Sequence, residues 1–105
     1  MEINKHIDDE KTVFSLHGRL DAASSPKFQE SLEFAFESSK KIILNFKHLA
    51  YISSAGLRIL MIAIKTSMAT GVEFMVTNVP PEIMKLLEMT KLSSYIKIIQ
   101  EETDV

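Results

Sequence analysis

The hydrophobic and polar positions alternate in two short segments near the N-terminus. Residues 2–7 and 12–17 carry apolar side chains at roughly every second position, and the charged stretch 8–11 separates them. A period of two is typical of half-buried β-strands, and a polar stretch between two such segments is typical of a turn. The pattern therefore predicts an N-terminal pair of strands.

A helical period begins after the small residues that follow the second strand. Ser25 and Pro26 suit a helix start, because serine caps helices and proline is tolerated in the first turn. The apolar residues that come next are spaced i, i+4, i+7 and i+8, as in a helix that packs one face on a core. These residues are Phe28, Leu32, Ala35 and Phe36.

The remaining segments complete an alternation of strands and helices. The apolar run 41–46 lacks alternation and predicts a central strand covered on both faces. Further strands are predicted over 72–77 and 95–99, with a short helix opening near Pro80 and Pro81 between them. The order β-β-α-β-α-β-α-β predicts an α/β domain, a small mixed sheet flanked by helices.

The second helix of this series is predicted from about Ser54 to Thr70. Gly71 marks its end, because glycine readily takes the left-handed conformation that follows many helices. At 100° per residue, one stripe of large apolar side chains is expected to face the core. This predicted stripe comprises Leu57, Leu60, Met61, Ile64 and Met68.

The opposite face of this helix is the candidate interaction surface. Ile59 and Ile62 fall outside the predicted core stripe, and Arg58 and Lys65 lie close to them on the helix. An exposed apolar patch bordered by basic residues is typical of a protein-binding surface. Another helix or a loop of the same chain could equally cover it.

Length and composition are those of one globular domain, so we expect residues 1–105 to form a single unit. The chain has 105 residues, of which 46% are hydrophobic and 25% are charged. Twelve basic and fourteen acidic side chains give a net charge of −2 without charged blocks. This balance argues against nucleic acid or an anionic membrane as the partner.

Several chemistries lack the residues they need. Cysteine is absent, and His6, His17 and His48 fall in separate segments, so neither a metal site nor a catalytic serine–histidine pair is expected. With three glycines and no phosphate-loop motif, no nucleotide or other cofactor is expected, nor an enzyme. The longest dense apolar run, 59–64, is far below the ~20 residues of a membrane span, and the N-terminus does not resemble a signal peptide. We expect a soluble, cytoplasmic protein.

The turn between the central strand and the second helix carries two adjacent serines. Either Ser53 or Ser54 could cap the helix by accepting a hydrogen bond from a backbone N–H. A phosphate on a serine here would face the positive end of the helix, an interaction worth roughly 0.3 to 1 kcal/mol. The fold would therefore tolerate phosphorylation, whereas a partner covering the turn would have to bury an unpaired charge.

Three segments resemble the STAS family, the sulfate-transporter and anti-sigma-factor-antagonist domain. They are Gly18-Arg19-Leu20-Asp21, the serine turn 53–58, and the Asn78-Val79-Pro80 break. Within the family, the chain is most similar to the small bacterial anti-sigma factor antagonists. The resemblance extends over nearly the whole chain and implies the STAS fold.

The resemblance also implies a regulatory cycle. The family's phosphoacceptor serine stands two positions before the turn glycine, which is Gly56 here, and so corresponds to Ser54. The unphosphorylated protein would bind an anti-sigma factor that is also a serine kinase and free a sigma factor. Phosphorylation of Ser54 would release it, and a serine phosphatase would reset it. The implied partner surface comprises Ser54, Ala55, Arg58, Ile59, Ile62 and Lys65.

One residue of the turn departs from the family's pattern. The residue before the acceptor is commonly aspartate, and here it is Ser53, which becomes an alternative acceptor. Asp21 matches a loop acid that would lie near the site and could orient the serine hydroxyl. STAS domains also occur as constitutive subunits of transport or stressosome-type assemblies. The alternative is therefore a structural subunit in which Ser54 only caps the helix.

Overall fold

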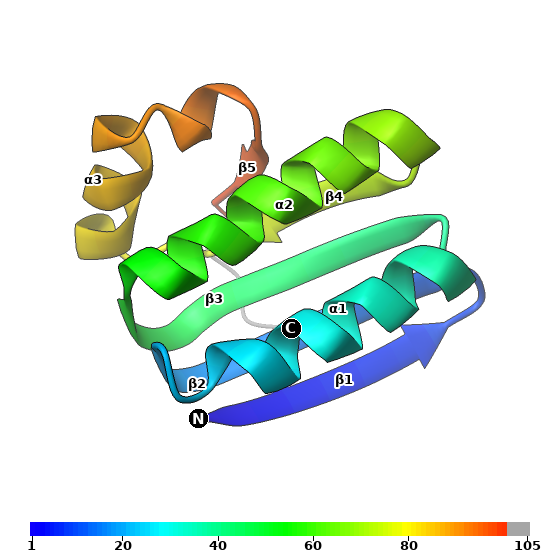
Figure 1. Cartoon of the computed structure of the whole chain (residues 1–105), viewed down its shortest axis with the longest axis horizontal. Coiled ribbons are helices and arrows are strands. Elements are labelled where there is room, and N and C mark those ends of the chain that lie inside the picture. The colour runs from blue at the N-terminus through cyan, green and yellow to red at the C-terminus, as the bar shows by residue number, and fades with distance from the viewer. Residues whose placement is uncertain (101–105) are drawn as a thin grey trace.

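A five-stranded sheet with the strand order β1-β2-β3-β4-β5 forms the base of the molecule (Figure 1). The structure is a computed structural model and describes residues 1–100, so residues 101–105 lie outside the described part. Strand β1 pairs antiparallel with β2, and all the other neighbouring strands are parallel. The strands are β1 (Glu2–Asp8), β2 (Lys11–Leu20), β3 (Lys41–Ile52), β4 (Glu73–Thr77) and β5 (Lys97–Ile99).

Three α-helices and one short 3₁₀ helix connect the strands. They are α1 (Ser25–Ser38), α2 (Ser54–Thr70), α3 (Pro81–Met89) and η1 (Leu92–Ser94). The predicted order of strands and helices is confirmed, with η1 as an addition before the last strand. Strand β5 begins at Lys97 instead of Tyr95, because η1 uses the preceding residues. Gly71 follows α2 with a φ of 80°, as predicted from its position.

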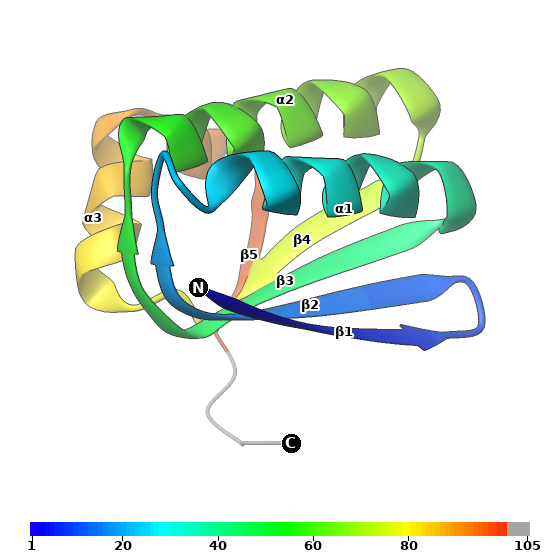
Figure 2. The ribbon, with the colours of Figure 1, turned by 60° about the horizontal axis from the view of Figure 1, so that its bottom comes forward.

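Helices α1 and α2 lie side by side on one face of the sheet, and α3 stands at its end (Figure 2). The core lies between this helical layer and the sheet. The rings of Phe14 in β2 and Phe28 in α1 meet edge-on, with centroids 5.7 Å apart, and Phe36 of α1 contacts Phe74 of β4. All four residues of the predicted α1 stripe are buried.

The expectation that the central strand is covered on both faces is wrong. Along the first half of β3, fully buried and half-buried residues alternate, so that Ile42 and Leu44 face the helices while Ile43 does not. Since α1 and α2 both lie on one face, nothing in the helical layer covers the other. A continuous apolar run therefore does not distinguish a strand covered on both faces from one covered on a single face.

Irregular pairing between β2 and β3 shapes the end of the sheet that carries the serine turn. The register shifts between Ser15 and His17 and again between Gly18 and Arg19, where Gly18 has a φ of 106°. Extra residues of this kind bend and twist a strand pair. Figure 2 shows the ends of β2 and β3 rising toward the helices, which brings Leu20 and Ile52 up against the start of α2.

The one-sided core predicts unequal effects of two neighbouring substitutions in β3. Leu44→Ala should lower the free energy of unfolding by about 2 to 5 kcal/mol, because it leaves a cavity in a fully buried site. Ile43→Ala should cost less than about half as much, since its side chain is partly exposed and leaves no closed cavity. Chemical denaturation of both variants measures the difference, and equal losses would mean that both faces of β3 are covered.

Candidate functional site

The serine turn is held to the sheet by its backbone. Ser53 directly follows β3, and its N–H donates to the carbonyl oxygen of Leu20 in β2 at 2.9 Å. Its backbone is extended, with φ −92° and ψ 177°, as usual for a residue that caps a helix. The turn therefore begins from a fixed point at the edge of two paired strands.

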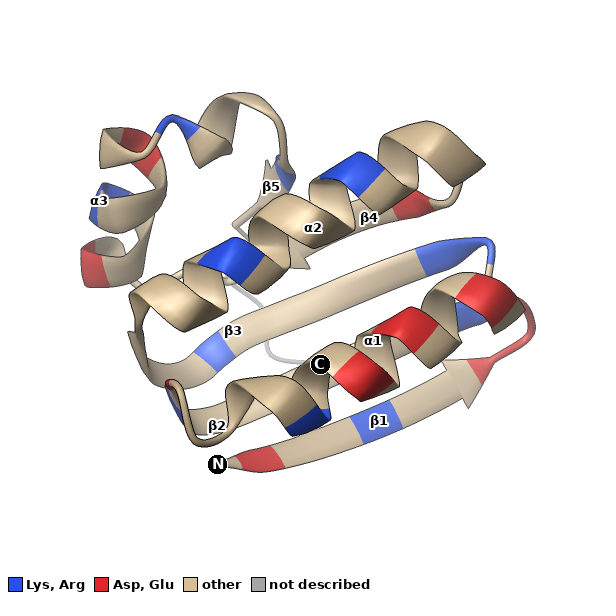
Figure 3. Cartoon of the chain, viewed as in Figure 1, with Lys and Arg blue, Asp and Glu red and all other residues tan. Residues whose placement is uncertain are grey.

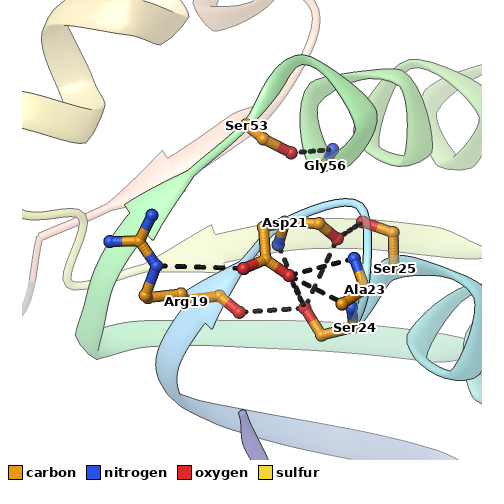
Figure 4. Close-up of polar contacts among 7 residues, drawn as sticks. All are labelled: Arg19, Asp21, Ala23, Ser24, Ser25, Ser53 and Gly56. Carbon is orange, nitrogen blue, oxygen red and sulfur yellow. Dashed lines mark hydrogen bonds and ion pairs between the residues drawn. The ribbon is translucent and has the colours of Figure 1, made fainter.

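Ser53 is the residue that caps α2. Its Oγ accepts a hydrogen bond from the N–H of Gly56 at 3.3 Å (Figure 4). This bond satisfies one of the backbone donors that the first turn of a helix leaves without a partner. Aspartate and serine are both strong caps, so serine at this position preserves the capping role that the family's aspartate could fill.

Gly56 lets the first turn of α2 approach the sheet closely. A Cβ atom at this position would lie 2.7 Å from Cγ1 of Ile52, and 3.0 Å from both Cγ and the carbonyl oxygen of Leu20. These neighbours are buried core residues and a backbone oxygen, which have little room to move. The absence of a side chain at Gly56 therefore sets how α2 sits on the ends of β2 and β3.

Ser54 is the first residue of α2, and its side chain is exposed. Within residues 1–100, no hydrogen bond involves its hydroxyl group, in contrast to the hydroxyl of Ser53. The structure thus separates two serines that the sequence left equivalent. One hydroxyl supports the helix, and the other lies open to a reagent or a partner.

Asp21 organises its own loop and makes no bond to either serine. Its Oδ1 accepts from the backbone N–H groups of Ala23 and Ser24, both at 3.1 Å, and from the Ser24 hydroxyl at 3.2 Å. The backbone hydrogen bond from Ser24 is the main cause that holds the pKa of Asp21 below its usual range. Within residues 1–100, no hydrogen bond or ion pair joins the Asp21 carboxylate to Ser53 or Ser54. The carbonyl oxygen of Leu20, just before Asp21, does bond the Ser53 N–H, so the role of Asp21 near the acceptor hydroxyl stays a prediction.

Arg19 joins this loop to the end of β3, which sequence reasoning did not anticipate. Its Nε lies 3.8 Å from Oδ2 of Asp21, and its guanidinium lies 4.2 Å from the centre of the Tyr51 ring. A guanidinium over an aromatic face is attracted by the ring's electrons. Arg19 stands opposite Tyr51 only because the β2–β3 register shifts just before it, so strand pairing alone places this contact.

The outer face of α2 is rotated from the predicted one. Ile59 is 3% exposed, so the expectation that it belongs to an exposed patch is wrong, whereas Ile62 is 38% exposed as expected. Met61 and Met68, predicted to be core, are 45% and 71% exposed. The buried residues of α2 are Gly56, Ile59, Leu60, Ala63 and Ile64.

The rotation has a simple physical cause. The buried arc of α2 includes the small residues Gly56 and Ala63, which let the helix lie close to the sheet and to α1. The prediction places the largest apolar side chains toward the core. In the observed orientation Gly56 and Ala63 face inward instead, so the predicted helix is rotated about its own axis. Of the predicted partner surface, Ser54, Arg58, Ile62 and Lys65 are exposed, and Ala55 is half-buried.

The described residues contain neither a cluster of metal-ligating side chains nor a membrane-spanning helix. Within the described part of the chain, no three His, Cys, Asp or Glu side chains gather closely enough to hold a metal ion. Among the helices of residues 1–100, none is long and apolar enough to cross a membrane.

Comparison with known proteins identifies the family. The STAS domain profile matches residues 2–105. The chain belongs to the STAS domain family. The anti-sigma-B factor antagonist of Listeria monocytogenes is 27% identical over 107 residues, which cover 100% of this STAS chain and 92% of that protein.

Solved structures share the fold of this STAS domain. The anti-sigma factor antagonist SpoIIAA in its unphosphorylated form superposes with a TM-score of 0.77, at 19% identity over 97% of this chain and 90% of that one. The phosphorylated form of the Bacillus protein gives the same TM-score, at 20% identity over 96% and 94% of the two chains. A sulfate transporter family protein from Wolinella succinogenes also reaches 0.77, at 13% identity over 90% and 80%. Antagonists and transporters thus share this architecture.

Because Ser53 caps α2 and Ser54 does not, removing the two hydroxyls should change the free energy of unfolding by different amounts. Ser53→Ala should lower the free energy of unfolding by about 1 kcal/mol, because a helix cap is lost. Ser54→Ala should change it by no more than about 0.5 kcal/mol, since an exposed hydroxyl without a bond is removed. Thermal or urea unfolding compares the two variants. A loss confined to Ser54→Ala would place the cap on Ser54 instead.

Proposed function

We propose that this STAS domain is an anti-sigma factor antagonist that is switched by phosphorylation of Ser54. In its unphosphorylated form it binds an anti-sigma factor that is also a serine kinase, and this binding frees a sigma factor in the cytoplasm. Phosphorylation by that kinase releases the antagonist, and a serine phosphatase returns it to the binding form. The function is therefore protein binding, with no catalytic step on this chain.

The observation that carries the proposal is the unbonded, exposed hydroxyl of Ser54 at the first position of α2. A phosphate there would meet the positive end of a 17-residue helix. Because Ser53 keeps the cap, this phosphate would break no hydrogen bond of the fold. Phosphorylation at Ser54 would change the surface and leave the domain intact.

Release follows from where the charge would lie. Ser54 and Arg58 are one helical turn apart on the exposed face, and Ile62 continues the same face by another turn. A partner covering this face would bury the phosphate, which costs several kcal/mol when the charge is left unpaired. A hundredfold loss of affinity needs only about 2.8 kcal/mol, so one phosphate suffices to release the partner.

The similarity to the sulfate transporter family protein supports a second candidate, a constitutive structural subunit of a transport or stressosome-type assembly. In that case Ser54 would not be modified and would lie outside the surface that binds the partner. The two candidates differ in a single measurable property, the response of binding to a negative charge at Ser54.

Incubation with the cognate anti-sigma kinase and ATP, followed by mass spectrometry, tests the switch. We expect one phosphate on the wild type and on Ser53→Ala, and none on Ser54→Ala. The kinase should bind Ser54→Asp at least about tenfold more weakly than the wild type, because the carboxylate introduces a charge at the interface. Ser94→Asp adds the same charge at an exposed serine of η1 and should bind normally.

The other outcomes are equally informative. A phosphate on Ser53 alone would retain the switch and correct the acceptor. If neither serine is phosphorylated and Ser54→Asp binds its partner with wild-type affinity, the chain is a constitutive subunit and the proposed switch is wrong.

A further inference from the structure

A groove runs between the two helices that cover the sheet. It encloses about 290 Å³ and is lined by residues from both helices. Figure 2 shows α1 and α2 side by side over the same face of the sheet. The groove opens to solvent, because exposed residues such as Glu33, Glu37 and Ile62 line it. The lining residues are Gln29, Leu32, Glu33, Phe36 and Glu37 of α1, and Ile59, Ile62, Ala63, Thr66 and Thr70 of α2.

The floor of the groove is apolar and preformed. Leu32, Phe36, Ile59 and Ala63 are each at least nine-tenths buried, so their packing against the core fixes the floor. A volume of 290 Å³ is at the lower limit of sites that enclose a whole small molecule. The groove is therefore suited to a few apolar side chains of a larger partner.

One wall of the groove carries two acidic side chains, and the Gln29 amide donates a hydrogen bond to one of them, Glu33, at 3.4 Å. Glu33 and Glu37 line it from α1, and neither forms an ion pair with any residue of the described chain. Figure 3 shows acidic residues in succession along α1, whereas the basic Arg58 and Lys65 of α2 are not among the lining residues. Any occupant that places basic side chains beside Glu33 and Glu37 gains favourable charge pairing.

The length of the groove indicates that a short helix would fit in it. From Gln29 to Glu37 the α1 wall covers nine residues, and the eight rises between them span roughly 12 Å at 1.5 Å each. That length matches about two turns of a helix, which would present apolar side chains at positions i, i+3 or i+4, and i+7 to the floor. A helix laid in the groove would also bring its flanking residues to the level of the two glutamates.

We propose that this groove binds an amphipathic helix of a protein partner whose apolar face is flanked by lysine or arginine. The site is independent of Ser54, because no residue of the serine turn lines it. Ile62 is shared, since it forms a wall of the groove and also belongs to the exposed face of α2. The proposal therefore concerns a second binding surface and does not rest on phosphorylation.

Three synthetic peptides of the same length test the proposal. The first is a helix with leucines at i, i+3 and i+7 flanked by lysines. The second has glutamates in place of the lysines, and the third is a scrambled version of the first without an apolar face. Fluorescence anisotropy at low salt measures their affinity for the full chain. We expect the lysine peptide to bind at least tenfold more tightly than the other two.

Charge substitutions in α1 locate the binding site. The double variant Glu33→Gln and Glu37→Gln should weaken the lysine peptide between about twofold and thirtyfold, as expected for the loss of two exposed ion pairs. A matched double variant, Glu30→Gln and Glu88→Gln, removes two exposed charges outside the groove and should bind within twofold of the wild type. Ser54→Asp should also leave the affinity within twofold, so a failed phospho-switch and a failed groove can be told apart.

Three results would overturn the proposal. The first is equal affinity for the lysine and glutamate peptides or for the scrambled peptide, and the second is an equal response of the two double variants. The third is a dimer in sedimentation equilibrium that Glu33→Gln and Glu37→Gln convert to a monomer, because the groove would then hold a second copy of this chain.

Discussion

The close approach of α2 to the ends of β2 and β3 is the constraint on which the site depends. It exists because Gly56 has no side chain where any Cβ would collide with Ile52 and Leu20. The same few atoms hold the turn in place, since the N–H of Ser53 bonds to Leu20 and the hydroxyl of Ser53 bonds to Gly56. Because the N–H and the hydroxyl of Ser53 are both hydrogen-bonded, Ser54 is the serine of the turn that is exposed to solvent.

Much of the fold was predictable because its signals are local. The bounds of α2 follow from the serines before it and Gly71 after it, and the start of α3 follows from the prolines. The rotation of α2 was not predictable in the same way. Ile59 is buried and Met61 is exposed because α1 lies beside α2. The sequence of α2 alone does not indicate on which side α1 packs.

The candidate site likewise has features that the sequence predicts and features that depend on tertiary contacts. The sequence predicts that the serine turn follows a strand and starts a helix. It does not distinguish the roles of Ser53 and Ser54, because they are adjacent serines and either position suits a helix cap. The carboxylate of Asp21 accepts hydrogen bonds within the loop before α1, and its role near the acceptor serine stays a prediction. The contact between Arg19 and Tyr51 depends on the irregular β2–β3 register, which only the paired strands reveal.

The free energy of unfolding of Gly56→Ala tests this account most directly. Alanine is a better helix former than glycine by about 1 kcal/mol, so at an open helical position the variant would be the more stable protein. The close approach predicts the opposite sign, a net loss of about 1 to 2 kcal/mol, because the added Cβ overlaps buried neighbours. A variant as stable as the wild type, or more stable, would contradict the claim that this contact positions the serine turn.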